Sequence, residues 1–253
     1  MSTTVDSFSM ESTYVLSKLG ANQQHPELTE YLLEEQEVKL TNYADPNTYQ
    51  LLEYVNRLAS ILSRQHLCID QEGAIRGLLN LPEIKGKWEI LKRELMKMNP
   101  VAAFEIVKQK DRELAHPAEL IDNMANAHFM SLFGQGYGAL HQTQESFVRE
   151  GMQRDRLGIG VQIPVLKTFQ CTPSQEGKLI QVLAAFNPKK KIDKSLLVQV
   201  TGHERIDVKH DSRAEFCYAE DNTLLYASQH LFEQLNDEYA IDLYLDLKCH
   251  DQI

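Results

Sequence analysis

The residues from Tyr239 to His250 alternate between two rows, and this pattern constrains the fold more than any other feature of the chain. The apolar row consists of Tyr239, Ile241, Leu243, Leu245, Leu247 and Cys249. The mostly polar row consists of Ala240, Asp242, Tyr244, Asp246, Lys248 and His250. Such alternation is typical of an antiparallel strand with one face on a core and one in water. We therefore predict that Leu243 and Leu245 are buried and that the opposite row is exposed.

The remainder of the second half also favours strands. Apolar residues alternate with Gly158, Gly160, Gln162 and Pro164 from Leu157 to Val165, which predicts a strand there. Shorter strands are predicted over 179–186, 196–200, 206–208, 214–219 and 223–231. The stretches around Gly134, Gly136 and Gly138 and over 151–156 are expected to be loops.

The first half favours helices around one hairpin. Asp45-Pro46 combines an N-cap residue with proline at the first helical position, which predicts a helix that ends near Ser63. Gly73 provides the positive φ of a tight turn between two short strands over 66–70 and 74–78. Three further helices are predicted. The first buries Trp88, the second begins at Asn99-Pro100, and the third runs from Leu120 to Gly134 and contains His128 as a core histidine. Strands are expected over 13–19 and 38–41.

Because helices concentrate in the first half and antiparallel strands in the second, the sequence predicts an α+β fold. We expect a curved antiparallel sheet, mainly from the C-terminal half, packed on one side by helices from the N-terminal half. Residues 1–12 are expected to be a flexible tail and 13–253 a single domain. A subdivision into a helix-rich part, 13–134, and a sheet part, 157–253, is the alternative.

Composition narrows the function classes. With 26 Lys+Arg against 36 Asp+Glu, the net charge of −10 argues against general nucleic-acid binding. The N-terminus resembles no signal peptide, and no apolar run is long enough to span a bilayer. Cys68, Cys171, Cys217 and Cys249 are scattered, which favours buried thiols in a reducing compartment. These features together predict a cytoplasmic protein.

No motif in the sequence identifies catalytic, cofactor-binding or metal-binding residues. The glycines around Gly136 follow a helix and precede no Lys-Ser/Thr pair, so they do not resemble a phosphate loop. The run from His203 to Asp211 is dense in titratable groups, but on a strand His203 and Asp207 would lie about 13 Å apart. We therefore expect a solvent-facing strand there.

The strongest indication of function in the sequence is a group of acidic residues near its C-terminal end. Residues 213–253 contain nine acidic residues and only Arg213 and Lys248 as bases. Asp242, Tyr244 and Asp246 combine carboxylates with an exposed aromatic ring, which suits an interface with a basic protein partner. The sequence therefore favours a non-enzymatic binding protein of the inhibitor, immunity-protein or secretion-adaptor type.

Two other functions stay open on the sequence alone. One is a carrier that holds a small apolar ligand between the sheet and the helices. The other is a hydrolase or metal-dependent enzyme whose site is assembled from distant residues such as His203, Asp207, His210 and Glu215. Converging histidines and carboxylates in an open pocket would favour the enzyme.

Overall fold

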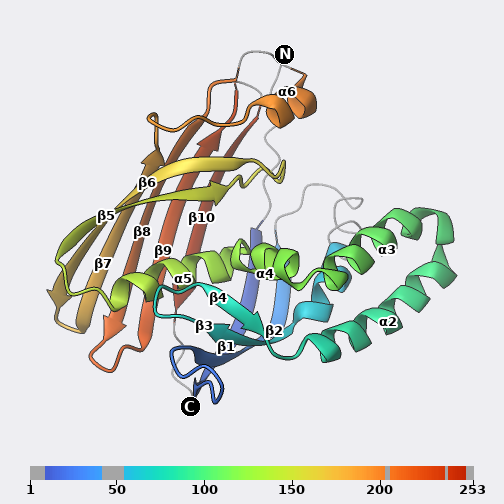
Figure 1. The fold of residues 1–253 in the computed structure, drawn as a ribbon, viewed down its shortest axis with the longest axis horizontal. Helices are drawn as coiled ribbons and strands as arrows, with labels where there is room; N and C mark the ends of the chain where they lie inside the picture. Colours follow the sequence, from blue (N-terminus) through green and yellow to red (C-terminus); the bar gives the residue numbers. More distant parts are fainter. Residues whose placement is uncertain (1–8, 42–53, 203–205, 237–238, 249–253) are drawn as a thin grey trace. The chain divides into compact units, whose positions relative to one another are not determined.

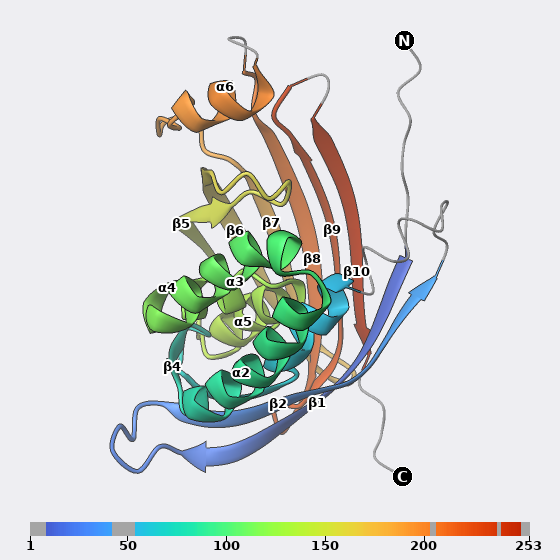
Figure 2. The same ribbon diagram turned by 90° about the vertical axis from the view of Figure 1, so that its right-hand side faces the viewer.

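The computed structural model describes residues 9–41, 54–202, 206–236 and 239–248, which divide into two compact units at Ala125/Asn126. Figure 1 and Figure 2 show the elements of both units from two directions. Each unit contains its own antiparallel sheet, with four strands in the first and six in the second. The α+β class and the curved antiparallel sheet of the C-terminal half are therefore confirmed.

The first unit joins a four-stranded meander to a set of helices. Its sheet has the order β1-β2-β3-β4, and all neighbours are antiparallel. The strands are β1 (Ser9–Ala21), β2 (Thr29–Thr41), β3 (Arg64–Ile69) and β4 (Ile75–Leu78). A short 3-10 helix, η1 (Ser60–Leu62), lies before β3 in the chain. Three helices follow β4: α2 (Leu81–Met98), α3 (Pro100–Ala115) and α4 (Pro117–Ala125).

Several first-unit predictions are confirmed. Gly73 has φ 81° in the turn between β3 and β4, as the hairpin requires. Trp88 is buried in α2 and its indole N–H donates to Asp111 Oδ1 at 2.7 Å. The strands are longer than expected: β2 covers the whole of 29–41, and β1 includes residues 9–12 of the expected tail. Residues 1–8 and the helix start at Asp45-Pro46 lie outside the described residues.

The second unit is an open six-stranded sheet with helices on one face. The strand order is β10-β9-β8-β7-β6-β5, all antiparallel and consecutive in sequence. The strands are β5 (Ser146–Arg154), β6 (Gln162–Ser174), β7 (Gly177–Phe186), β8 (Lys209–Ala219), β9 (Leu224–Gln234) and β10 (Ala240–Lys248). Two helices accompany them, α5 (His128–Leu140) and α6 (Ser195–Thr201).

Two apolar clusters cover the helix-bearing face of the sheet, which we call the inner face. Leu132, Ala139 and Leu140 of α5 pack on a cluster that includes Phe169, Ile180, Val182, Phe216 and Tyr218. Leu197 of α6 packs on a second cluster with Ile163, Val165, Ile206 and Leu235. Leu245 and Leu247 of β10 are half-buried against the first cluster, and Leu243 is also half-buried. The predicted inward row of β10 is thus on the correct face but less deeply buried than expected.

The predicted loop around Gly136 was wrong, because these glycines are part of α5. The long helix expected from Leu120 to Gly134 is instead interrupted at 126–127, between α4 and α5. A Cβ on Gly136 would lie 2.6 Å from Tyr218 Oη and still closer to the ring of Phe216. Glycine is needed here because the helix backbone lies directly on the aromatic side chains of β8.

Other errors lie in the segments that flank the sheet. The strand predicted at 196–200 is α6, whose Leu197 and Thr201 share one buried face and which ends with Gly202 at φ 69°. Residues 157–161 form a loop before β6, and the polar stretch 151–156 mostly belongs to β5. Residues 206–208 precede β8 rather than forming a strand.

A pair of glycine substitutions tests the close contact of α5 with the sheet. Gly136→Ala is expected to lower the free energy of unfolding by about 1–3 kcal/mol, because overpacking outweighs the better helix propensity of alanine. Gly86 of α2 is exposed, and a Cβ at this position would have no other atom within 4 Å, so Gly86→Ala should raise stability by about 0.5–1 kcal/mol. Urea denaturation measures both; a stabilising Gly136→Ala would contradict the packing of α5.

Candidate functional site

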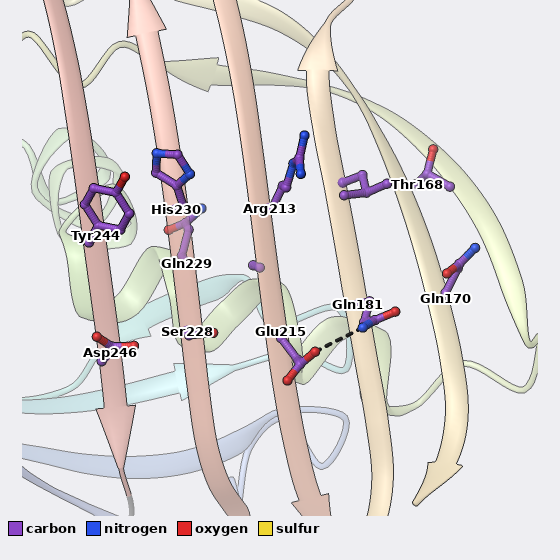
Figure 3. A pocket seen from close by; sticks show the side chains of 12 residues that line it. Thr168, Gln170, Gln181, Arg213, Glu215, Ser228, Gln229, His230, Tyr244 and Asp246 are labelled. Atoms are coloured by element: carbon purple, nitrogen blue, oxygen red, sulfur yellow. Dashed lines mark hydrogen bonds between the residues drawn. The ribbon is translucent and has the colours of Figure 1, made fainter.

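The outer face of the six-stranded sheet, opposite α5, carries a hollow of about 420 Å³ (Figure 3). Cross-strand register explains its lining. One row of partners runs Thr168, Leu183, Arg213, His230 and Tyr244 from β6 to β10. The adjacent row runs Gln170, Gln181, Glu215, Ser228 and Asp246. Both rows line the hollow, so it is built from side chains that alternate outward on five neighbouring strands.

The three residues predicted from sequence lie together at one end of this hollow. Asp242, Tyr244 and Asp246 all point outward on β10, and Tyr244 is 67% exposed. Tyr244 and Asp246 line the hollow, and Asp242 lies in the next row. Their joint exposure on one strand agrees with the alternation from which they were chosen. Their proposed role in binding stays a prediction.

His230 is the residue that the sequence reasoning missed in this group. Its ring stacks on Tyr244 with centroids 4.3 Å apart and the planes 3° from parallel. Its Nε2 lies 2.6 Å from Asp242 Oδ1. His230 therefore fixes the orientation of both β10 side chains. His230 is the direct cross-strand partner of Tyr244 in the pairing of β9 with β10. The sequence indicates this contact only when the register of the two strands is known.

The outward rows of β8 and β10 each carry two carboxylates, Asp211 and Glu215 on β8 and Asp242 and Asp246 on β10. Arg213 lies in the middle of the hollow, and its Nε is 3.7 Å from Asp211 Oδ1. Glu215 accepts hydrogen bonds from Gln181 and from Tyr226, each at 3.0 Å. The Tyr226 hydroxyl has a raised pKa, chiefly because of that hydrogen bond to Glu215. Asp246, in contrast, takes part in no ion pair within the described ranges, so its charge is available to a partner.

The residues considered for an assembled enzyme site are not brought together. His210 points inward and is buried, whereas Glu215 of the same strand points outward. Asp207 is exposed before β8, and His203 lies outside the described residues. The expectation that the His203–Asp211 run faces solvent was wrong for His210. Its Nδ1 lies 3.2 Å from Glu233 Oε2, and both side chains are fully buried.

Potential metal ligands are dispersed in the part of the chain that the structure describes. In the described parts of the chain no group of three or more His, Cys, Asp or Glu side chains is placed to hold a metal ion. Cys68, Cys171 and Cys217 are buried free thiols, as predicted, and burial raises the pKa of each. Cys249 lies outside the described ranges.

None of the described helices is long and apolar enough to cross a membrane.

No protein-family model matches the chain, and neither a curated protein nor a solved structure does. The two faces of the six-stranded sheet are therefore the features that bear on function.

Glu233 on the inner face and Asp242 on the outer face each contact a histidine, so substitutions of the two allow the stability contributions of the faces to be compared. Glu233→Ala should lower the free energy of unfolding by about 3 kcal/mol or more, because it leaves His210 and the backbone N–H of Arg156 unpartnered in the interior. Asp242→Ala removes an exposed partner of His230 and should cost less than about 1 kcal/mol. Guanidinium denaturation of both variants measures the difference; equal costs would contradict the assignment of the two faces.

Proposed function

We propose that the protein binds a basic protein partner through the outer face of the six-stranded sheet. The observation that carries this proposal is the outer-face patch, which we define as His230, Asp242, Tyr244 and Asp246. It combines an exposed, stacked aromatic ring with two carboxylates beside a hollow. Such a combination supplies both the anchor and the charge complementarity of a protein interface.

The stacking of Tyr244 on His230 supports its role as an anchor. A free tyrosine side chain loses rotamer freedom when it is buried in an interface, and this loss weakens binding. Here the parallel stack and the Asp242–His230 contact already hold the ring in place before a partner arrives. The hollow beside the ring offers a place for an apolar side chain of the partner to enter.

Charge reversal tests the acidic part of the proposal. The double change Asp242→Lys and Asp246→Lys leaves the inward row of β10 intact, so the fold should survive. Partners captured by the wild-type protein from its native cells should be basic and should be lost by this variant. Quantitative mass spectrometry of the captured proteins measures the loss.

A matched control separates the local effect from total charge. Glu89→Lys with Glu105→Lys changes the net charge by the same amount on two exposed helical positions of the first unit. This control should keep the partners that the β10 variant loses. Loss of the same proteins in both variants, or capture of acidic proteins or nucleic acid only, would contradict the proposal.

The aromatic anchor predicts a separate kinetic effect. Once a partner is purified, Tyr244→Ala should increase its dissociation rate at least tenfold and leave its association rate nearly unchanged. Asp246→Lys should instead slow association and weaken its dependence on salt. Surface plasmon resonance at two ionic strengths distinguishes these effects, and unchanged kinetics in both variants would exclude this face.

A further inference from the structure

Basic side chains gather on the inner face of the sheet, on the side of the strands away from the outer-face patch. Arg149 of β5 and Lys167 of β6 are direct cross-strand partners. Both are half-buried on the row that faces the helices. Like charges directly opposite each other destabilise an antiparallel pair. The arrangement is therefore unfavourable unless something compensates the two charges.

The surroundings of this pair contain no compensating carboxylate among the described residues. The guanidinium of Arg149 lies over the rings of Phe147 and Phe169, 5.2 Å and 5.7 Å from their centroids. The ammonium of Lys167 donates to Gln135 Oε1 of α5 at 2.9 Å. Neither basic group forms an ion pair with an acidic side chain in the part of the chain that the structure describes.

Arg156 adds a third basic group from the loop before β6. Its guanidinium donates to the backbone oxygen of Asn126 and to Ser131 Oγ, and its Nε is buried without a hydrogen-bond partner. Ser131 and Gln135 are four residues apart, so they lie on one face of α5 and connect Arg156 with Lys167. The three basic groups thus border one region between α5 and the β5–β6 pair.

The carboxylates nearest Arg156 are already occupied. Glu233 Oε1 accepts the backbone N–H of Arg156 at 2.8 Å, and Glu233 Oε2 contacts His210. Asp155 accepts the backbone N–H groups of residues 159–161 at 2.6–2.8 Å. Backbone N–H groups leave the charge of a carboxylate in place, so Glu233 and Asp155 still offset part of the positive charge at Arg156. Among the described residues, no carboxylate acts in this way on Lys167.

The acid–base properties of the cluster agree with this imbalance. Burial and the neighbouring Arg156 and Arg149 lower the pKa of Lys167 to about 8. His128, in the first turn of α5, also has a lowered pKa because of desolvation and the charge of Arg156. It is exposed rather than a core histidine, contrary to the sequence prediction. Desolvation is the larger cause of both shifts, and the positive charges of the neighbouring arginines add to it.

The row that contains Arg149 and Lys167 continues with small side chains. Lys167 is paired with Ala184 of β7, and Ala184 is paired with Ser212 of β8. Apolar clusters flank this row on both sides along the strands, under α5 and under α6. The row is therefore basic at β5 and β6 and small at β7 and β8, between the two apolar clusters of the inner face.

We infer that Arg149, Lys167 and Arg156 form a binding site for a small oxyanion, the phosphate or carboxylate group of a small molecule. Arginine and lysine side chains are the usual ligands of such groups, and a guanidinium can contact an oxyanion at two points. A bound anion would remove the repulsion between Arg149 and Lys167. This inference is independent of the proposed outer-face partner.

The first test is calorimetric titration of the whole protein with inorganic phosphate and, separately, with acetate, in a buffer of weakly binding ions. Saturable binding in the micromolar to low millimolar range is expected for at least one of the two, and which one binds identifies the group. Absence of saturable binding for both would overturn the inference.

Two lysine variants locate the binding. Lys167→Met keeps the apolar stem but removes the charge, and it should weaken anion binding at least tenfold. Lys209→Met is the matched control, because Lys209 also donates to a glutamine oxygen, Gln234 Oε1 at 3.1 Å, but from an exposed position at the start of β8. Binding should be unchanged in that variant. Equal affinity in Lys167→Met and the wild-type protein would overturn the site.

A measurement on the wild-type protein keeps the test valid if Lys167→Met does not fold. With isotope-labelled lysine, the Nζ resonance of Lys167 should titrate near pH 8 without anion. A bound anion should raise this pKa by about one unit or more, because an opposite charge nearby favours the protonated amine. An unchanged Lys167 titration under saturating anion would show that the anion binds elsewhere.

Discussion

The second unit depends on the close approach of α5 to the sheet at Gly136. Without a side chain at this position, the helix backbone lies against Phe216 and Tyr218, which lets Leu132, Ala139 and Leu140 fill the apolar cluster below. The same approach brings Ser131 and Gln135 within hydrogen-bonding distance of Arg156 and Lys167. One contact thus closes the core and positions the polar side chains of α5 that contact Arg156 and Lys167.

The alternation of β10 allowed its two faces to be predicted because it depends only on the period of a strand. The same rule, followed along β6, would have placed Lys167 on the apolar row with Val165 and Phe169. A charged residue in such a row is a usable signal, and it is present in the sequence itself. His230 and Glu233 could not be recognised in this way, since their roles depend on which strands pair and in which register.

The failures share a physical cause. The apolar residues at 196–200 favoured a strand, but Asp193 Oδ1 accepts the backbone N–H of Ser195 at the start of a helix, and Gly202 ends it. Glycine has a low helix propensity, which favours a loop around Gly136, but the contact of Gly136 with β8 requires a glycine within the helix. The glycines at 158 and 160 continued an alternating pattern, but a buried carboxylate, Asp155, holds that segment as a loop. In each case a tertiary contact or a cap outweighed the local pattern.

The two-residue period of the sheet has a consequence for how this sequence can diverge. Outward and inward residues alternate from Lys209 to Phe216 in β8 and from Tyr226 to Gln234 in β9, so an insertion of one residue there would exchange the faces beyond it. Glu233 would then face water and Phe232 would take its buried position. Length changes inside these strands should therefore survive in pairs of residues, whereas the turn at 220–223 can accept any number. Relatives of this protein should show gaps at that turn and almost none within the strands.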